Sequence, residues 1–234
     1  MVEVIVAATS DVHSPRYLLE FIAVLSRRRE ECRTVDLFLW AGDMVERGNV
    51  QALRPLLEAV RSSCPKARIV AVFGNEEYMD REHKFMKMYP EVIWLNDTYM
   101  TFEKAGRKIA IYGTRGSLDE PTPWQRRHIP AIRRIYHERA VRLERVVREL
   151  KEKGYTVLTL MHYAPTRATL EGEDPKIWPY MASREMEKAI LASKPDIVIH
   201  GHAHNSVKLE AQLDGIRVYN VAFPARRDIL VIRL

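Results

Sequence analysis

The sequence predicts an α/β fold: one domain, residues 1–234, in which two sheets are covered by helices on their outer faces. Two observations predict it. Over the first third of the chain, apolar strand-like segments alternate with helix-like segments, a pattern typical of a sheet with parallel members and covering helices. In the last third, three short strand-like segments follow one another, which indicates a region richer in β-structure.

The first third contains three strand–helix units. Strands are expected at 2–11, 35–43 and 67–75, and helices at 14–31, 49–63 and 76–89. Ser14 is placed to cap the first helix, with Pro15 at the first helical position. Pro55 should kink or restart the second helix, because proline lacks the backbone N–H that a helix interior needs.

The middle of the chain predicts a hairpin and one long helix. Residues 98–113 contain two strands around the sequence KAGRK, with glycine at the turn, and 117–130 is a loop or short helix. From 131 to 153, apolar residues recur at steps of three and four, which predicts a helix that ends at Gly154.

The remaining elements are two strands separated by a loop and a helix, followed by the three short strands. We expect a strand at 155–162, a loop at 163–181, a helix at 183–193, a strand at 195–201, and short strands at 206–213, 216–222 and 228–234. The Asp214-Gly215 turn should join the first two short strands as a hairpin.

The composition is that of an ordinary soluble domain, with 47% hydrophobic and 29% charged residues. No apolar run approaches the ~20 residues of a membrane helix, so no membrane partner is expected. Cys32 and Cys64 have no C-x-x-C spacing, which favours a cytoplasmic location with reduced thiols. Arginine outnumbers lysine 26 to 11 and only three glutamines occur, which is typical of a thermophile.

The net charge of +6 is concentrated in a helical arginine-rich insertion at about 120–153. This segment could follow nucleic-acid phosphates, or it could be a solvated face. The spacing predicts ion pairs of Glu138 with Arg142 and of Glu144 with Arg148. Four arginines would then remain unpaired, at 126, 127, 133 and 134. A nucleic-acid partner, a lid and a homo-oligomer contact all remain open.

Polar side chains stand where each apolar strand ends. They are Asp11 and His13, then Asp43, then Asn75 with Glu76 and Glu77, then His162, and last His200, His202 and His204. In an open α/β sheet the carboxyl ends of the strands meet at one crevice, so we expect these side chains to lie together.

The donor types indicate metal ions. Imidazole and carboxylate suit manganese, iron, zinc or nickel, and no thiolate is offered. Six or seven ligands exceed the set that one catalytic zinc uses. They suit two metals ~3.5–4 Å apart that share a bridging carboxylate. Glycine precedes Asp43, Asn75 and His202, which fits close backbone packing around the ions.

Taken in order, DVH, GD, GN, a lone H and GHAH resemble the metal-binding signature of the calcineurin-like metallophosphoesterase superfamily, over residues 11–204. The resemblance implies a four-layer α/β/β/α sandwich of two mixed sheets, with the site at the carboxyl ends of the strands. It implies that Asp11, His13 and His204 hold one metal, that Asn75, His162 and His202 hold the other, and that Asp43 bridges both. Two divalent ions are implied, with manganese favoured over iron, zinc, nickel or magnesium.

The activity implied by this resemblance is hydrolysis of a small phosphate ester, by in-line attack of a hydroxide that bridges the metals. Asp43, Asn75, Glu76 and His162 are the expected catalytic residues. The family's third motif normally continues with a histidine that assists the leaving group, but here that position is Glu76. This departure favours phosphodiesters, or activated monoesters, over ordinary monoesters.

The substrate pocket is predicted only from proximity in the sequence. Arg115 follows a strand, and Arg167, Trp178 and Tyr180 lie in the loop after His162. Two other functions remain open: a nuclease that uses the same metals with the arginine-rich helix as a guide, and a metal-binding module without catalysis.

Overall fold

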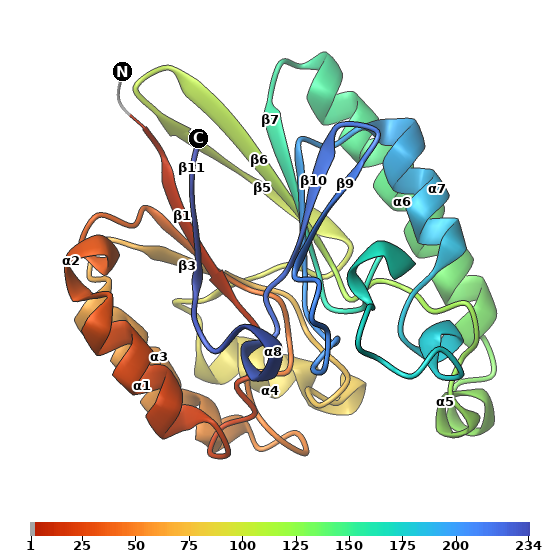
Figure 1. The fold of residues 1–234 in the computed structure, drawn as a ribbon, viewed down its shortest axis with the longest axis horizontal. Helices are drawn as coiled ribbons and strands as arrows, with labels where there is room; N and C mark the ends of the chain where they lie inside the picture. Colours follow the sequence, from red (N-terminus) through yellow and green to blue (C-terminus); the bar gives the residue numbers. More distant parts are fainter. Residues whose placement is uncertain (1–2) are drawn as a thin grey trace.

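The computed structural model describes residues 3–234, which form four layers in the order helices, sheet, sheet, helices (Figure 1). The first sheet has the strand order β11-β1-β2-β3-β4. Its strands are β1 (Ile5–Thr9), β2 (Leu37–Trp40), β3 (Arg68–Ala71), β4 (Ile93–Trp94) and β11 (Leu230–Arg233). β1 to β4 are parallel, and β11 pairs antiparallel with β1. The sheet is therefore mixed.

The second sheet is also mixed, with the strand order β5-β6-β7-β8-β10-β9. Its strands are β5 (Thr98–Lys104), β6 (Arg107–Thr114), β7 (Thr156–Met161), β8 (Ile197–His200), β9 (Glu210–Leu213) and β10 (Ile216–Asn220). Both predicted hairpins are present. The turns place Ala105-Gly106 and Asp214-Gly215 at positive φ, which a two-residue hairpin turn requires.

Helices cover the outer face of each sheet (Figure 1). On the first sheet lie α1 (Leu18–Arg27), α2 (Arg29–Cys32), α3 (Leu53–Ser63) and α4 (Glu82–Met88). On the side of the second sheet lie α5 (Pro123–His128), α6 (Ile132–Glu152) and α7 (Arg184–Ser193), and α8 (Phe223–Arg226) precedes β11. No helix within residues 3–234 is long and apolar enough to cross a membrane.

Alternation along the strands divides the core into three layers. In β2, Phe38 and Trp40 face α1 and α3, whereas Leu37 and Leu39 face the second sheet. Successive residues of a strand point to opposite faces, and both faces of β2 are covered. All four side chains are therefore buried. The outer core of the second sheet is filled by the apolar stripe of α6 and by α7.

The structure corrects the predicted start of the first helix. α1 begins at Leu18, and Ser14 does not cap it. Instead the Ser14 backbone pairs with the segment after β2: its N–H donates to the Met44 carbonyl and its carbonyl accepts from Glu46. At 76–89, helix α4 begins only at Glu82 after a short 3₁₀ turn, and Pro55 lies in the first turn of α3, where a restart was expected.

Candidate metal centre

The side chains predicted from the strand ends do meet at one edge of the two sheets. Asp11 follows β1, Asp43 follows β2, Asn75 follows β3, His162 follows β7, and the GHAH segment follows β8. Within residues 3–234, two overlapping groups could hold a cation: Asp11 with His13 and His204, and Asp11 with Asp43 and His162. The ligand atoms in each group lie within 4.8 Å of one another.

The first group is centred on Asp11. Its Oδ1 lies 2.9 Å from Nε2 of His204 and 3.8 Å from Nε2 of His13. The two imidazole Nε2 atoms are 3.5 Å apart. The other carboxylate oxygen of Asp11 accepts hydrogen bonds from the Ser10 hydroxyl and the His202 backbone N–H. One oxygen of Asp11 thus faces the cluster, and the other joins the loop after β1 to the loop after β8.

The second group is centred on Asp43. Its Oδ2 lies 3.5 Å from Nε2 of His162 and 4.0 Å from Nε2 of His13, so this carboxylate stands between the two groups. Nε2 of His162 lies 3.0 Å from Oδ1 of Asn75. The ring of His202 packs edge-on against that of His162, at 5.0 Å between centroids. All seven predicted ligands are therefore brought together at this edge.

Four of these seven residues have a backbone conformation that non-glycine residues rarely adopt. The φ angles are 55° for Asp11, 45° for His13, 52° for Asp43 and 71° for His202. A side chain at positive φ costs free energy, and such residues persist where the surroundings enforce them, often at functional sites. The strand-end loops thus hold an unfavourable backbone conformation at the residues whose side chains form the cluster.

Glycine is required at two places beside the ligands. A Cβ atom at Gly74 would overlap the carboxylate of Asp43, and one at Gly201 would overlap that of Asp11. These contacts explain why glycine precedes Asn75 and His202, as the sequence indicated.

Three of the four imidazoles of the centre are held in the neutral form; burial would also lower the pKa of His204, but the hydrogen bond to Asp11 and the charge of Asp11 raise it overall. Burial lowers the pKa of His13 and His162, and it lowers that of His202 to about 4. Nδ1 of His162 donates to the Ala41 carbonyl at 3.0 Å, so its Nε2 carries a lone pair directed into the cluster. Neutral imidazole with a free nitrogen is the form that binds a metal ion.

No lysine or arginine of residues 3–234 lies within 4.0 Å of the Asp11 or Asp43 carboxylate. Burial, Glu77 and Asp11 together raise the pKa of Asp43. Burial would also raise the pKa of Asp11, but the hydrogen bond from His204 and the nearby imidazoles lower it overall. Across residues 3–234, only histidines lie within ion-pair distance of these two carboxylates.

The donor set fits divalent cations. Nε2 of His162 and Oδ1 of Asn75 direct lone pairs at each other 3.0 Å apart. Nε2 of His13 lies 3.5 Å from Nε2 of His204, which also lies 2.9 Å from the Asp11 carboxylate. Facing acceptors repel one another unless a positive charge lies among them. Oxygen and imidazole ligands without a thiolate suit hard or borderline divalent metals.

Glu76 lies beside the centre but is not one of its ligands. Its backbone N–H donates to Oδ1 of Asp43 at 2.7 Å, and its carboxylate accepts from the Arg47 N–H at 2.7 Å. The side chain is half-buried. The carboxylate of Glu76 thus lies at the rim of the centre. The catalytic role expected for this residue stays a prediction.

Glu77 has a role that the sequence did not reveal. Its buried carboxylate accepts four backbone N–H groups, from Asp43, Met44, Val45 and Gly74, at 2.7 to 3.2 Å. It therefore ties the loop after β2 to the loop after β3 and fixes the position of Asp43. Only the doubled glutamate after GN could have indicated it.

The two arginines predicted to bind substrate are engaged in holding loops. The guanidinium of Arg115 is buried and donates to the carbonyls of Gly74 and Glu77 and to the Glu82 carboxylate. Arg167 donates to Asp119 at 2.9 Å. Their predicted substrate contacts are untested, and the contacts observed are structural.

The other two pocket residues predicted from the loop after His162 differ in their relation to the centre. The indole of Trp178 donates to the Glu173 carbonyl. The main chain of Tyr180 lies close enough to His202 to affect the pKa of that imidazole.

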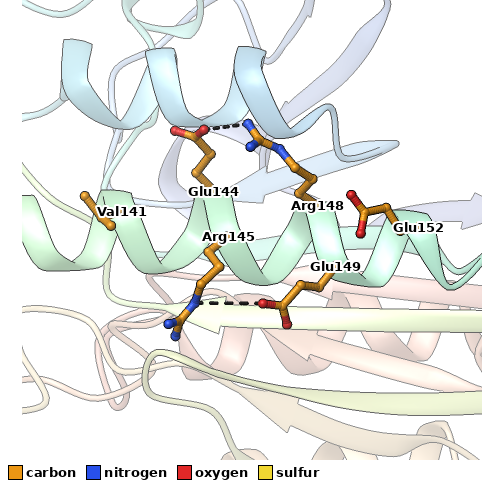
Figure 2. A pocket seen from close by; sticks show the side chains of 6 residues that line it. All are labelled: Val141, Glu144, Arg145, Arg148, Glu149 and Glu152. Carbon is orange, nitrogen blue, oxygen red and sulfur yellow. Dashed lines mark hydrogen bonds and ion pairs between the residues drawn. The ribbon is translucent and has the colours of Figure 1, made fainter.

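The arginine-rich segment is largely paired with carboxylates. Glu144 binds Arg148 at 2.6 Å and Glu149 lies 4.0 Å from Arg145, as Figure 2 shows. The Glu144 pair was predicted. The others differ from expectation: Arg134 pairs with Glu138, and Arg126 and Arg133 both face Glu120. Arg139 is buried against Asp97.

Comparison with known proteins confirms the resemblance of the sequence to the calcineurin-like phosphoesterases. A family model for calcineurin-like phosphoesterases matches residues 5–206. A search of curated proteins found no match.

Several solved structures share the fold. A putative 5'-nucleotidase from Staphylococcus aureus is 15% identical, with a TM-score of 0.63, over 100% of this chain and 51% of that one. An NAD nucleotidase from Haemophilus influenzae is 14% identical, with a TM-score of 0.58, over 99% and 53%.

A third structure, GAP50, the anchor in the inner membrane complex of Plasmodium, is 9% identical, with a TM-score of 0.63, over 100% and 82%. The chain spans about half the length of the two nucleotidases. At these identities the likeness concerns the fold.

Proposed function

The chain belongs to the calcineurin-like phosphoesterase family, and from this premise we propose that it is a metal-dependent phosphodiesterase. The observation that carries the proposal is the meeting of two buried carboxylates, four imidazoles and one amide at the strand ends. In the reaction, water adds to phosphorus and the ester oxygen leaves with a proton, which gives an alcohol and a phosphomonoester.

Two divalent cations, which we propose to be manganese, would be held by the residues of the two groups. Asp11, His13 and His204 would bind one cation, and Asn75, His162 and His202 the other, with Asp43 between them. When bound, the cations would supply Lewis-acid chemistry that lowers the pKa of water and neutralises charge on the phosphoryl oxygens.

The residues of the chain hold this donor set rigid. The Ala41 carbonyl fixes the tautomer of His162, and the Glu77 carboxylate fixes the loop that carries Asp43. Preorganised ligands of this kind cost little reorganisation when charge develops in the transition state.

The preference for diesters is argued from Glu76. Its carboxylate stands at the rim of the centre, next to Asp43. A phosphomonoester carries close to two negative charges at neutral pH, whereas a diester carries one. Repulsion by Glu76 therefore disfavours the monoester more strongly, because the Coulomb energy scales with the product of the charges.

The proposal is tested with manganese-loaded protein and two chromogenic esters, bis-p-nitrophenyl phosphate and p-nitrophenyl phosphate. We expect a larger kcat/KM for the diester. Glu76→Gln, which keeps an acceptor for the Arg47 N–H, should raise kcat/KM for the monoester relative to the diester. The control is Glu30→Gln, a carboxylate that pairs with Arg33. A larger kcat/KM for the monoester in the unsubstituted protein would contradict the diester preference.

A further inference from the structure

A second basic feature of the molecule lies beside the metal centre. A cavity of about 660 Å³ opens between residues 47–51 and helix α4. Four cationic side chains line it, Arg47, Arg81, Lys84 and Lys87, together with Met88 and the chain from 48 to 51. We call this cavity the cationic pocket. Its walls come from the segment after β2 and from the end of the segment after β3.

The charges of the cationic pocket are not balanced by the chain. No Asp or Glu lines it. Within residues 3–234, none of its four cations has a carboxylate within 4.0 Å, although Asp80 and Glu82 are close in sequence. Arg81 instead donates to the Gly48 carbonyl at 3.0 Å and lies over the exposed ring of Tyr78. A cavity with four unpaired cations is suited to an anion.

Glu76 connects the lining of the cationic pocket to the metal centre, although it is not part of that lining and is not one of the predicted ligands. The Arg47 N–H donates to the Glu76 carboxylate, and the Gly48 N–H donates to the Glu76 carbonyl, both at 2.7 Å. On its other side, the Glu76 N–H donates to Asp43 at 2.7 Å. Through Glu76, the segment of Arg47 and Gly48 at the edge of the cationic pocket is therefore connected to Asp43 by hydrogen bonds.

We propose that the cationic pocket binds a second phosphate group of the substrate, one that is not hydrolysed. This inference rests on the proposed phosphodiesterase function and adds a substrate class: phosphodiesters that carry another phosphate. Arginine and lysine together suit this ligand, since the guanidinium binds phosphate oxygens in pairs and the ammonium binds as a point charge.

The test uses two diesters that differ only in the second phosphate. They are thymidine 5'-(p-nitrophenyl phosphate) and the same compound with a phosphate on its 3'-oxygen. Both release p-nitrophenol from the same bond. For the manganese-loaded protein we expect a lower KM for the 3'-phosphorylated compound, with a similar kcat, and a loss of this advantage at high salt.

The variant that tests the pocket is Lys84→Gln with Lys87→Gln. It should raise KM for the 3'-phosphorylated compound by roughly fivefold, because exposed ion pairs each contribute modestly. KM for the simple diester should not change. The matched control is Arg145→Gln with Arg148→Gln on α6, which removes the same charge and should change neither KM.

The outcomes separate this inference from the proposed function. Equal KM values for the two compounds would refute phosphate binding in the cationic pocket. The same holds if the lower KM of the 3'-phosphorylated compound survives Lys84→Gln with Lys87→Gln. In both cases, hydrolysis of the simple diester would still support the phosphodiesterase function. If neither compound is hydrolysed, the proposed function fails. Calorimetry with thymidine 3',5'-bisphosphate and thymidine 5'-phosphate then still tests the pocket, since equal affinities would refute it.

A third ligand distinguishes the source of the second phosphate. Thymidine 5'-diphosphate carries it on an anhydride, as a nucleoside polyphosphate does, and the 3',5'-bisphosphate carries it as a nucleic-acid strand does. Tighter binding of the 3',5'-bisphosphate supports a strand, and tighter binding of the diphosphate supports a nucleoside polyphosphate. In either case the affinity must fall in Lys84→Gln with Lys87→Gln.

Discussion

The loops at the strand ends and the outer face of α6 are both rich in charge, but they arrange it in opposite ways. On α6, glutamates alternate with arginines on a regular helix, and Glu144 binds Arg148 (Figure 2). At the strand ends, Asp11 and Asp43 lie together on strained backbone, and the cationic pocket nearby has no carboxylate in its lining. Charge that the protein does not balance for itself indicates where a ligand binds.

The largest expected effect comes from removing the carboxylate between the two groups. Asp43→Ala should lower kcat/KM for bis-p-nitrophenyl phosphate by at least ~100-fold, since even partners of metal ligands contribute 10- to 100-fold. Steady-state kinetics with added manganese measure this effect. If a folded Asp43→Ala protein kept more than a tenth of the activity, the strand-end loops would be no more important for catalysis than the outer face of α6.

The next effect concerns stability of the strand-end loops. Glu77→Ala should lower the free energy of unfolding by at least ~3 kcal/mol, because it leaves four buried N–H groups without an acceptor. Urea denaturation of metal-free protein measures it. Glu77→Gln, which keeps one acceptor oxygen, should cost less. A change below ~1 kcal/mol for Glu77→Ala would show that this carboxylate does not hold the loops.

A smaller effect is expected from the buried imidazoles in metal-free protein. The pKa of His202 is lowered by burial to about 4, whereas an unfolded histidine titrates near ~6.5. Between pH 4 and ~6.5 the unfolded chain binds more protons at this histidine than the folded chain does. The stability that comes from keeping His202 neutral is therefore fully present above pH ~6.5 and is lost as the pH falls towards 4.

The variant His202→Gln isolates that contribution. It should reduce the slope of unfolding free energy against pH in this window by up to ~1.4 kcal/mol per pH unit. The control is His128→Gln, an exposed histidine on α5. Equal slopes for the unsubstituted protein and His202→Gln would show that the imidazole is not held neutral.

The smallest effect is expected on α6. Arg145→Gln with Arg148→Gln should change the free energy of unfolding by less than ~1 kcal/mol, because both ion pairs are exposed to solvent. Turnover of bis-p-nitrophenyl phosphate should stay the same. A large loss of turnover would mean that the α6 face takes part in substrate binding, as the nuclease interpretation predicted.

Most of the fold and the grouping of the candidate ligands could be predicted because both follow from local patterns. Apolar runs indicated the strands, and candidate ligands such as Asp43 and His162 stand directly after them, so their meeting at one edge needed no knowledge of distant contacts. The positive φ values at these positions were not predictable, because they depend on loops that hold one another, such as those joined by Glu77.

Two of the errors share one cause, which is a partner that is distant in the sequence. Ser14 looked like a helix cap, but its backbone pairs with Met44 and Glu46. Arg142 was expected to bind Glu138 by helix spacing, whereas its guanidinium reaches the carbonyl of Asp97. Local spacing cannot indicate contacts that the packing of two segments creates.

The most direct test of the account counts bound metal. Protein stripped with a chelator is dialysed against manganese, and the ions per chain are measured by mass spectrometry. We expect two in the unsubstituted protein and in Arg145→Gln with Arg148→Gln, and fewer than two in Asp43→Ala. If the unsubstituted protein binds none, or if Asp43→Ala still binds two, then the strand-end residues do not form a two-metal centre.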